Sequence, residues 1–141
     1  MRPRDQVKRE LVGRWLAQAD ADLAVAGRLL PDGAPHAWAV AFHAQQAAEK
    51  FLKAFLAHCQ IEFPKTHDLV QLLALVASKD RALAESLKET AALTPYGVEI
   101  RYPGEFPEVT ASDAQQALEL ASAVREAVRE ALAPHAGEMP G

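Results

Sequence analysis

Apolar and polar residues alternate along most of this chain with the spacing of an α-helix. From about Gln6 to Leu30 the apolar positions fall on one face, as expected for a helix that packs on a core. Asp22 lies at the edge of that face and is a candidate partner for polar groups on a neighbouring helix. The apolar stripe consists of Val12, Trp15, Ala19, Leu23, Ala26 and Leu30.

The same spacing predicts further helices, separated by residues that favour turns. Pro31-Asp32-Gly33 predicts a turn, and a second helix is expected from about Pro35 to Cys59. Thr66 is expected to cap a third helix, with Asp68 in its first turn. A fourth helix is expected from about Lys79 to Leu93. The apolar face of the third helix is predicted to be Leu69, Leu72, Leu73 and Val76.

The segment Thr94–Val109 breaks the helical pattern with its proline and glycine residues, so an irregular segment is expected there. Thr110 and Asp113 then resemble a capping box that starts a last helix, which continues to Ala133. The apolar stripe of this last helix is Ala114, Ala117, Leu118, Ala121, Val124, Val128 and Leu132.

These patterns predict a single all-α domain over residues 1–141, with residues 135–141 as a flexible tail. The expected fold is an antiparallel up-and-down helical bundle of about five helices, with one long irregular loop before the last helix.

The second helix carries two kinds of polar position. Gln45 and Glu49 fall toward its apolar side, where an amide and a carboxylate must find partners or destabilise the fold. They are expected to form a buried network with Asp22, with Arg101 or with a neighbouring helix end. Replacing Glu49 is therefore expected to cost more stability than replacing Lys53, which is placed on the polar side.

His43, Lys50 and Lys53 share that polar side with Gln46. Two interpretations stay open for the three basic residues. They form either a solvated or interface face, or a set of donors for a phosphate-bearing ligand.

Two further segments carry candidate ligand contacts. Lys65 and His67 precede the third helix, whose start favours anions, although Asp68 competes with an anion there. Arg101 and Tyr102 lie in the irregular segment, where an arginine beside an aromatic residue suits a phosphate or a base. Alternatively, Arg101 pairs with a carboxylate inside the fold. Any ligand cleft is expected to contain Arg101 and Tyr102, with His67 or Lys50 nearby.

Three of these segments together resemble the HEPN domain family. They are FHAQQAAEKFLKA at 42–54, KTHDL at 65–69 and RYP at 101–103, and the spacing of Trp15, Ala19, Asp22 and Leu23 fits as well. The resemblance implies a small prokaryotic all-helical protein that forms a homodimer. It also implies a minimal nucleotidyltransferase as partner, in a toxin–antitoxin type pair, and an association with a nucleotide or RNA.

The alternative function within this resemblance is a metal-independent endoribonuclease. RNA-cleaving members carry an Arg-x4–6-His motif, and no histidine follows Arg101 at that spacing. Arg129 and His135 match the spacing, but His135 lies in the expected tail, so the match is interpreted as chance. Replacing His135 is accordingly expected to change nothing. A structural oligomer without a ligand is the third hypothesis.

Composition narrows these hypotheses only moderately. A formal net charge of −4 argues against a broad nonspecific coat of nucleic acid, while a local basic cleft stays compatible with it. Cys59 is the single cysteine, and the five histidines are scattered, so no metal site is expected. No cofactor motif is present, and no apolar run is long enough to cross a membrane. The expected location is the cytoplasm.

Overall fold

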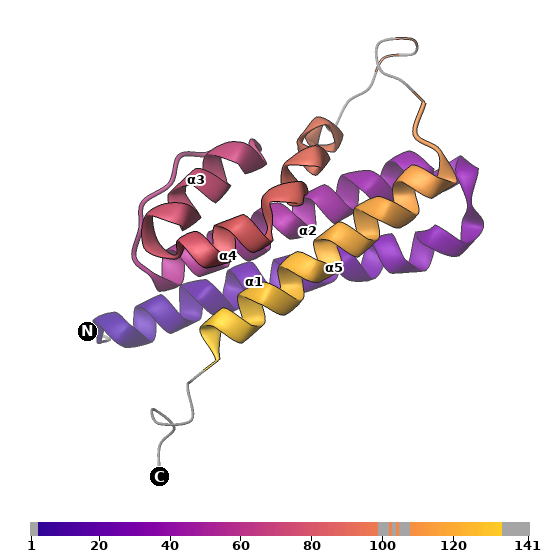
Figure 1. Ribbon diagram of the computed structural model, residues 1–141. Coiled ribbons are helices and arrows are strands. Elements are labelled where there is room, and N and C mark those ends of the chain that lie inside the picture. The colour runs from indigo at the N-terminus through magenta and orange to yellow at the C-terminus, as the bar shows by residue number, and fades with distance from the viewer. Residues whose placement is uncertain (1–2, 99–101, 103, 105–107, 134–141) are drawn as a thin grey trace.

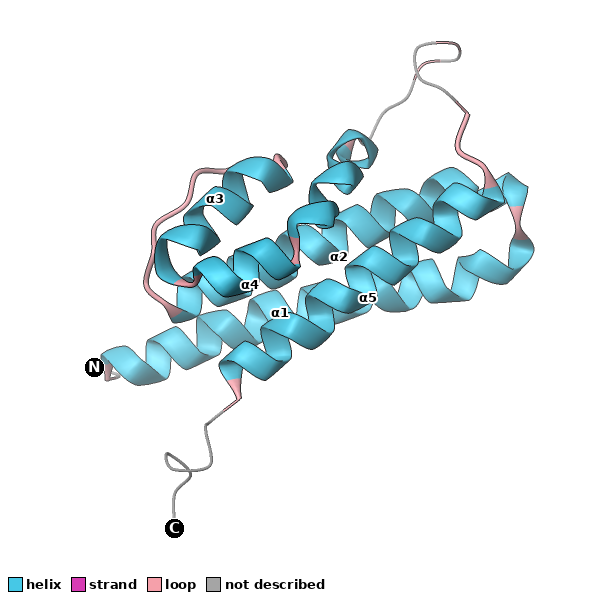
Figure 2. Ribbon diagram, in the orientation of Figure 1, coloured by secondary structure: helices cyan, strands magenta, loops and turns pink. Residues whose placement is uncertain are grey.

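Three long helices form the body of the molecule. The computed structural model describes residues 3–98, 102, 104 and 108–133, and these residues include no β-strand. Helices α1 (Arg4–Leu29), α2 (Ala37–His58) and α5 (Ala111–Leu132) lie side by side, and shorter helices pack beside them (Figures 1 and 2). The predicted all-α bundle is therefore confirmed.

Helix α2 is the central element of the bundle. It packs against α1, α5, α3 (Leu69–Lys79) and the 3-10 helix η3 (Lys88–Gly97). Small side chains let these helices approach closely, and large apolar side chains fill the space between them. The largest fully buried apolar side chains are Phe51, Leu52, Leu56, Leu69, Leu72, Leu93, Val40, Val76, Val124 and Val128.

The connection from α1 to α2 uses a glycine where the backbone requires one. Two short 3-10 helices, Leu30–Asp32 and Ala34–His36, meet at Gly33, whose φ is +73°. Residues with side chains rarely adopt this conformation. The turn predicted at Pro31-Asp32-Gly33 is thus present, and it lets α1 and α2 run in opposite directions.

The predicted cap of the third helix was wrong. Helix α3 begins at Leu69, and its cap is Asp68, whose Oδ1 accepts a hydrogen bond from the Val70 N–H at 2.9 Å. Thr66 lies two residues earlier, and its Oγ1 accepts a hydrogen bond from the Asp68 N–H at 3.0 Å. Both side chains can cap a helix, and the local sequence alone did not show which of them does so here.

The predicted fourth helix is divided in the structure. Asp80 adopts an extended conformation, and its side chain caps the short helix α4 (Arg81–Ser86). The chain then continues as η3, so residues 94–97, expected to be irregular, are in a 3-10 helix. By contrast, the Thr110–Asp113 capping box is confirmed, with both of its hydrogen bonds at 3.0 Å. The expected tail lies outside the described residues.

Candidate functional site

A buried carboxylate, Glu49, organises the polar residues of α2. Glu49 is 3% exposed, as its position on the apolar side of the helix predicted. Its Oε1 lies 2.7 Å from Nδ1 of His67, and its Oε2 accepts a hydrogen bond from the Lys53 ammonium at 2.9 Å. The carboxylate is thus paired on both oxygens, which is what its burial requires. Of the expected partners, Asp22 does not contact it, and Arg101 lies outside the described residues.

Lys53 is buried, and its predicted place on a solvated face was wrong. The Lys53 Nζ lies 5.5 Å from the ring centroid of Trp15 and 5.9 Å from that of Phe63. These two rings, which meet edge to face, lie within reach of cation–π contacts with the ammonium. Periodicity within α2 could not reveal these contacts, because the two rings come from α1 and from the segment after α2.

Gln45 extends the network toward η3 and the start of α3. Its Nε2 donates to the His67 carbonyl oxygen at 3.1 Å and to Glu49 Oε1 at 3.3 Å. Its Oε1 accepts a hydrogen bond from the Gln46 side chain at 2.7 Å. The Gln45 amide also lies directly against Gly97, where a Cβ atom would stand 3.0 Å from it. The amide therefore links three segments of the fold.

A second cluster, like the first, joins one carboxylate to a histidine and a lysine. Asp22 Oδ1 lies 2.9 Å from Nδ1 of His43, and its Oδ2 accepts a hydrogen bond from the Lys50 ammonium at 2.6 Å. Asp22 of α1 therefore contacts polar groups of α2, as its position at the edge of the apolar face predicted. These three side chains are partly buried, so His43 and Lys50 hold the two helices together instead of forming a purely solvated face.

The remaining candidate contacts are exposed or lie outside the described residues. Lys65 is exposed, and the side chain of His67 is 69% exposed although its Nδ1 is held by Glu49. Tyr102 is 67% exposed, while Arg101 falls outside the described residues. The structure thus brings together His67, Gln45, Glu49 and Lys53, and the predicted cleft around Arg101 stays a prediction.

Arg129 joins α5 to α1. Its Nη2 donates to Oδ2 of Asp20 at 2.5 Å, and the Arg125 Nε donates to Oδ1 of the same carboxylate at 3.0 Å. The sequence does not reveal this cluster, because Asp20 lies more than a hundred positions from the two arginines. Their helical spacing on α5 was the one local signal, since Arg125 and Arg129 share a face. His135 lies outside the described residues.

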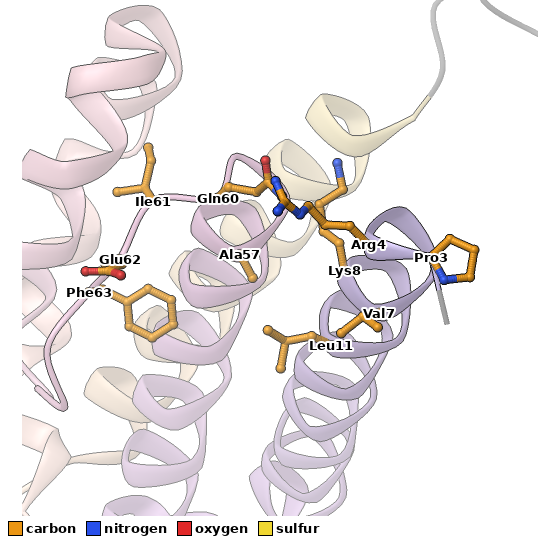
Figure 3. A pocket seen from close by; sticks show the side chains of 10 residues that line it. All are labelled: Pro3, Arg4, Val7, Lys8, Leu11, Ala57, Gln60, Ile61, Glu62 and Phe63. Atoms are coloured by element: carbon orange, nitrogen blue, oxygen red, sulfur yellow. The ribbon is translucent and has the colours of Figure 1, made fainter. Parts of the chain in front are cut away.

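An open groove lies between the first turns of α1 and the segment that follows α2 (Figure 3). It has a volume of about 1050 Å³. Val7 and Leu11 form the α1 wall, and Ile61 and Phe63 stand on the opposite side, as Figure 3 shows. Phe63 also covers Lys53, so the groove adjoins the Glu49 cluster. The rim carries Arg4, Lys8, Gln60 and Glu62.

Two groups at the end of α2 have shifted acidities. Burial and the nearby charge of Lys8 lower the pKa of His58. Burial raises the pKa of the Cys59 thiol, so this cysteine has no sign of an activated nucleophile. Among the described residues, no three or more His, Cys, Asp and Glu side chains gather where they could hold a metal ion. No helix in the described part of the chain is long and apolar enough to cross a membrane.

Comparison with known proteins places the chain among helical relatives. The family model of the HEPN domain matches residues 12–131. The crystal structure of TT1696 from Thermus thermophilus is 34% identical, covers 86% of this chain and 98% of its own, and has a TM-score of 0.65. ST0689, an archaeal HEPN homologue, is similar in fold, with 23% identity, the same coverages and a TM-score of 0.66. No curated protein matches the chain.

Proposed function

Because the chain belongs to the HEPN domain family, we propose that it is an interaction module whose partner is a minimal nucleotidyltransferase. The two proteins would form a toxin–antitoxin type pair. The resemblance of residues 42–54, 65–69 and 101–103 to HEPN proteins that occur with such enzymes supports this pairing.

The observation that carries this proposal is the groove between α1 and the segment after α2. Val7 and Leu11 on its wall are 45% and 46% exposed, and they lie one helical turn apart. Contiguous exposed apolar side chains beside a hollow are typical of a surface that binds another protein. An interaction module needs such a surface, and this groove provides one.

The charges around the groove indicate what occupies it. Arg4 and Lys8 stand on the α1 rim, against the single acid Glu62. A partner segment with apolar anchors and flanking carboxylates complements this rim. If a second copy of this chain bound here across a twofold axis, each copy would contribute two cations and only one acid to the contact. Like charges would then face each other. We therefore assign the groove to the nucleotidyltransferase, and we propose that the homodimer uses another face.

Co-expression tests the pairing directly. The chain should be produced together with the minimal nucleotidyltransferase encoded beside its gene, and the tagged enzyme purified. Recovery of both chains in one peak, with the mass of a complex by light scattering, is the expected result. The lack of a neighbouring gene of this type, or separate elution of the two proteins at micromolar concentration, would contradict the proposal.

A second candidate function, RNA cleavage, is favoured by one observation. A hollow of about 630 Å³ between α1 and α5 is lined by the basic residues Lys8, Arg9, His58 and Arg129. Against it, the Arg129 guanidinium is bound to Asp20, so it serves as an interhelical contact. RNA cleavage by the purified chain that is lost in His135→Ala would place the enzymatic function first.

A further inference from the structure

The groove beside the segment after α2 adjoins a second concave surface, the hollow between α1 and α5. Lys8 lines both of them, so the two surfaces meet at one side chain. Val7 and Leu11 of α1 line the groove, and Val12 and Leu16 of the same helix line the hollow. The beginning of α1 therefore stands between two recesses that a single partner segment can reach.

The hollow concentrates positive charge in a protein whose formal net charge is −4. Its lining includes Lys8, Arg9, Arg129 and His58, and no aspartate or glutamate among the described residues. Asp20 binds the guanidinium of Arg129. Lys8 and Arg9, by contrast, form no ion pair within the described part of the chain. Two cations of the hollow are thus available to an acidic group.

The rest of the lining is apolar or small, and the described residues place no aromatic ring in it. Val12, Leu16 and Leu132 can pack against an aliphatic side chain. They offer no ring on which a nucleic-acid base could stack, which is the usual means of holding a single strand. The hollow therefore fits a carboxylate carried by a peptide better than it fits RNA.

We propose that the nucleotidyltransferase partner extends from the groove past Lys8 and places an aspartate or glutamate side chain in the hollow, beside Arg9 and His58. This contact rests on the proposed function and adds a second half to the interface. The partner segment carries apolar residues for the groove and an acid beyond them. The acid complements the two unpaired cations and gives the interface its register.

His58 gives the contact a dependence on pH. Burial and then the charge of Lys8 lower the pKa of His58, so the ring of the free protein is neutral at neutral pH. A carboxylate bound beside the ring favours its protonated form and raises the His58 pKa. Binding therefore takes up a proton, and the affinity rises as the pH falls from the bound pKa toward the free one. The other charged groups around this end of α2 are Lys8 and Arg9 of α1, Arg129 of α5, and Lys79 and Asp80, which act on the adjacent Cys59.

Three variants separate this contact from the groove. Arg9→Glu reverses a charge in the hollow and leaves Val7 and Leu11 unchanged, because Arg9 does not line the groove. Arg14→Glu is the matched control, since it makes the same change at an exposed position of α1 that lines neither recess. His58→Gln removes the titrating ring and keeps a polar side chain. All three should retain the far-UV helical signal of the wild type.

The experiment is titration calorimetry of the chain with the minimal nucleotidyltransferase encoded beside its gene. It covers the pH range in which histidine titrates, in two buffers of different ionisation enthalpy, so that proton uptake is measured. The wild type and Arg14→Glu should bind alike, and Arg9→Glu should bind at least about tenfold more weakly. The wild type should bind more tightly and take up protons as the pH falls, and His58→Gln should show neither effect.

Equal binding by Arg9→Glu and Arg14→Glu, or a pH dependence that persists in His58→Gln, would overturn this contact and leave the paired-module function intact. A wild type that does not bind the enzyme at any pH would overturn both. A short single-stranded RNA is the second probe. RNA binding that Arg9→Glu abolishes would assign the hollow to RNA and overturn the proposal, whereas the proposal predicts no RNA binding there.

Discussion

The ammonium of Lys53 lies 2.9 Å from Oε2 of Glu49, one helical turn away along α2, and both side chains are almost fully buried. Two aromatic rings cover the lysine, and a histidine and a glutamine contact the carboxylate. A buried ion pair is sensitive to the loss of either partner, because the remaining charge cannot be rehydrated without opening the core. The first prediction follows from this sensitivity.

Glu49→Ala and Lys53→Ala should each destabilise the fold by about 3–5 kcal/mol, since each leaves one buried charge unpaired. The sequence pattern predicted a large effect for Glu49 alone, and the burial of Lys53 changes that expectation. Urea denaturation of the two variants measures the effect. Lys88→Ala is the control, because Lys88 pairs with Glu85 at the surface and should change stability by less than about 0.5 kcal/mol. A Lys53→Ala variant as stable as this control would contradict the burial of the pair.

Gly97→Ala should destabilise the fold by about 1–3 kcal/mol through overpacking. The new methyl group would stand 3.0 Å from the Gln45 side chain, which cannot withdraw without losing its contacts to Glu49 and the His67 carbonyl. Gly13→Ala provides the comparison: it lies within α1 with no atom within 4 Å of the added Cβ. That change should stabilise the fold by about 0.5–1 kcal/mol. Thermal unfolding that shifts in the same direction for both variants would argue against a rigid Gln45.

The start of α5 should lose stability in acid. Hydrogen bonds from the backbone N–H and then the side chain of Thr110 lower the pKa of Asp113 below its ordinary value. The native state therefore binds the proton less readily than the unfolded state. Its contribution is present above the unfolded pKa and is lost as the pH falls through the folded one.

The variant Asp113→Asn tests this pH dependence. It should be less stable than the wild type at neutral pH, and it should lose less stability on acidification to a pH below the ordinary pKa of aspartate. Denaturant midpoints measured across that pH range give the comparison. Parallel curves for the two proteins would show that the capping box does not titrate with the fold.

The homodimer implied by the family resemblance is a further prediction. Light scattering at micromolar concentration should give twice the chain mass, because an isologous contact can cover an apolar side chain such as Val70 that the single chain leaves exposed. A Leu11→Glu variant should keep the dimer mass if the groove is reserved for the partner. A monomer mass for the wild type would sink this prediction.

Local chemistry was enough to predict the parts of the fold that depend on short spacing. The apolar stripes gave the three long helices, and the Thr110–Asp113 pair gave a helix start, because both signals involve residues within a few turns of each other. The edge position of Asp22 also indicated a contact with polar groups of the second helix, but the partners are His43 and Lys50, and not the expected Gln45 and Glu49.

The features of the site that the sequence could not predict depend on contacts between segments that are distant along the chain. Lys53 lies on the polar side of its own helix, and only the approach of Trp15 and Phe63 buries it. The anchoring of His67 by Glu49 likewise requires the segment before α3 to return to α2. No periodicity within one helix carries that information. For the same reason, the ion pairs of Arg125 and Arg129 with Asp20 could not be predicted from the sequence.

The affinity of the chain for its neighbouring nucleotidyltransferase, measured by titration calorimetry for the wild type and for Leu11→Glu, tests the paired-module function most directly. Val25→Glu is the matched control, since it adds the same charge to an exposed apolar position of α1 outside the groove. We predict that the wild type and Val25→Glu bind alike, and that Leu11→Glu binds at least about tenfold more weakly, with all three proteins equally helical. A wild type that does not bind the nucleotidyltransferase, or a Leu11→Glu variant that binds it as well as the control, would contradict the paired-module function.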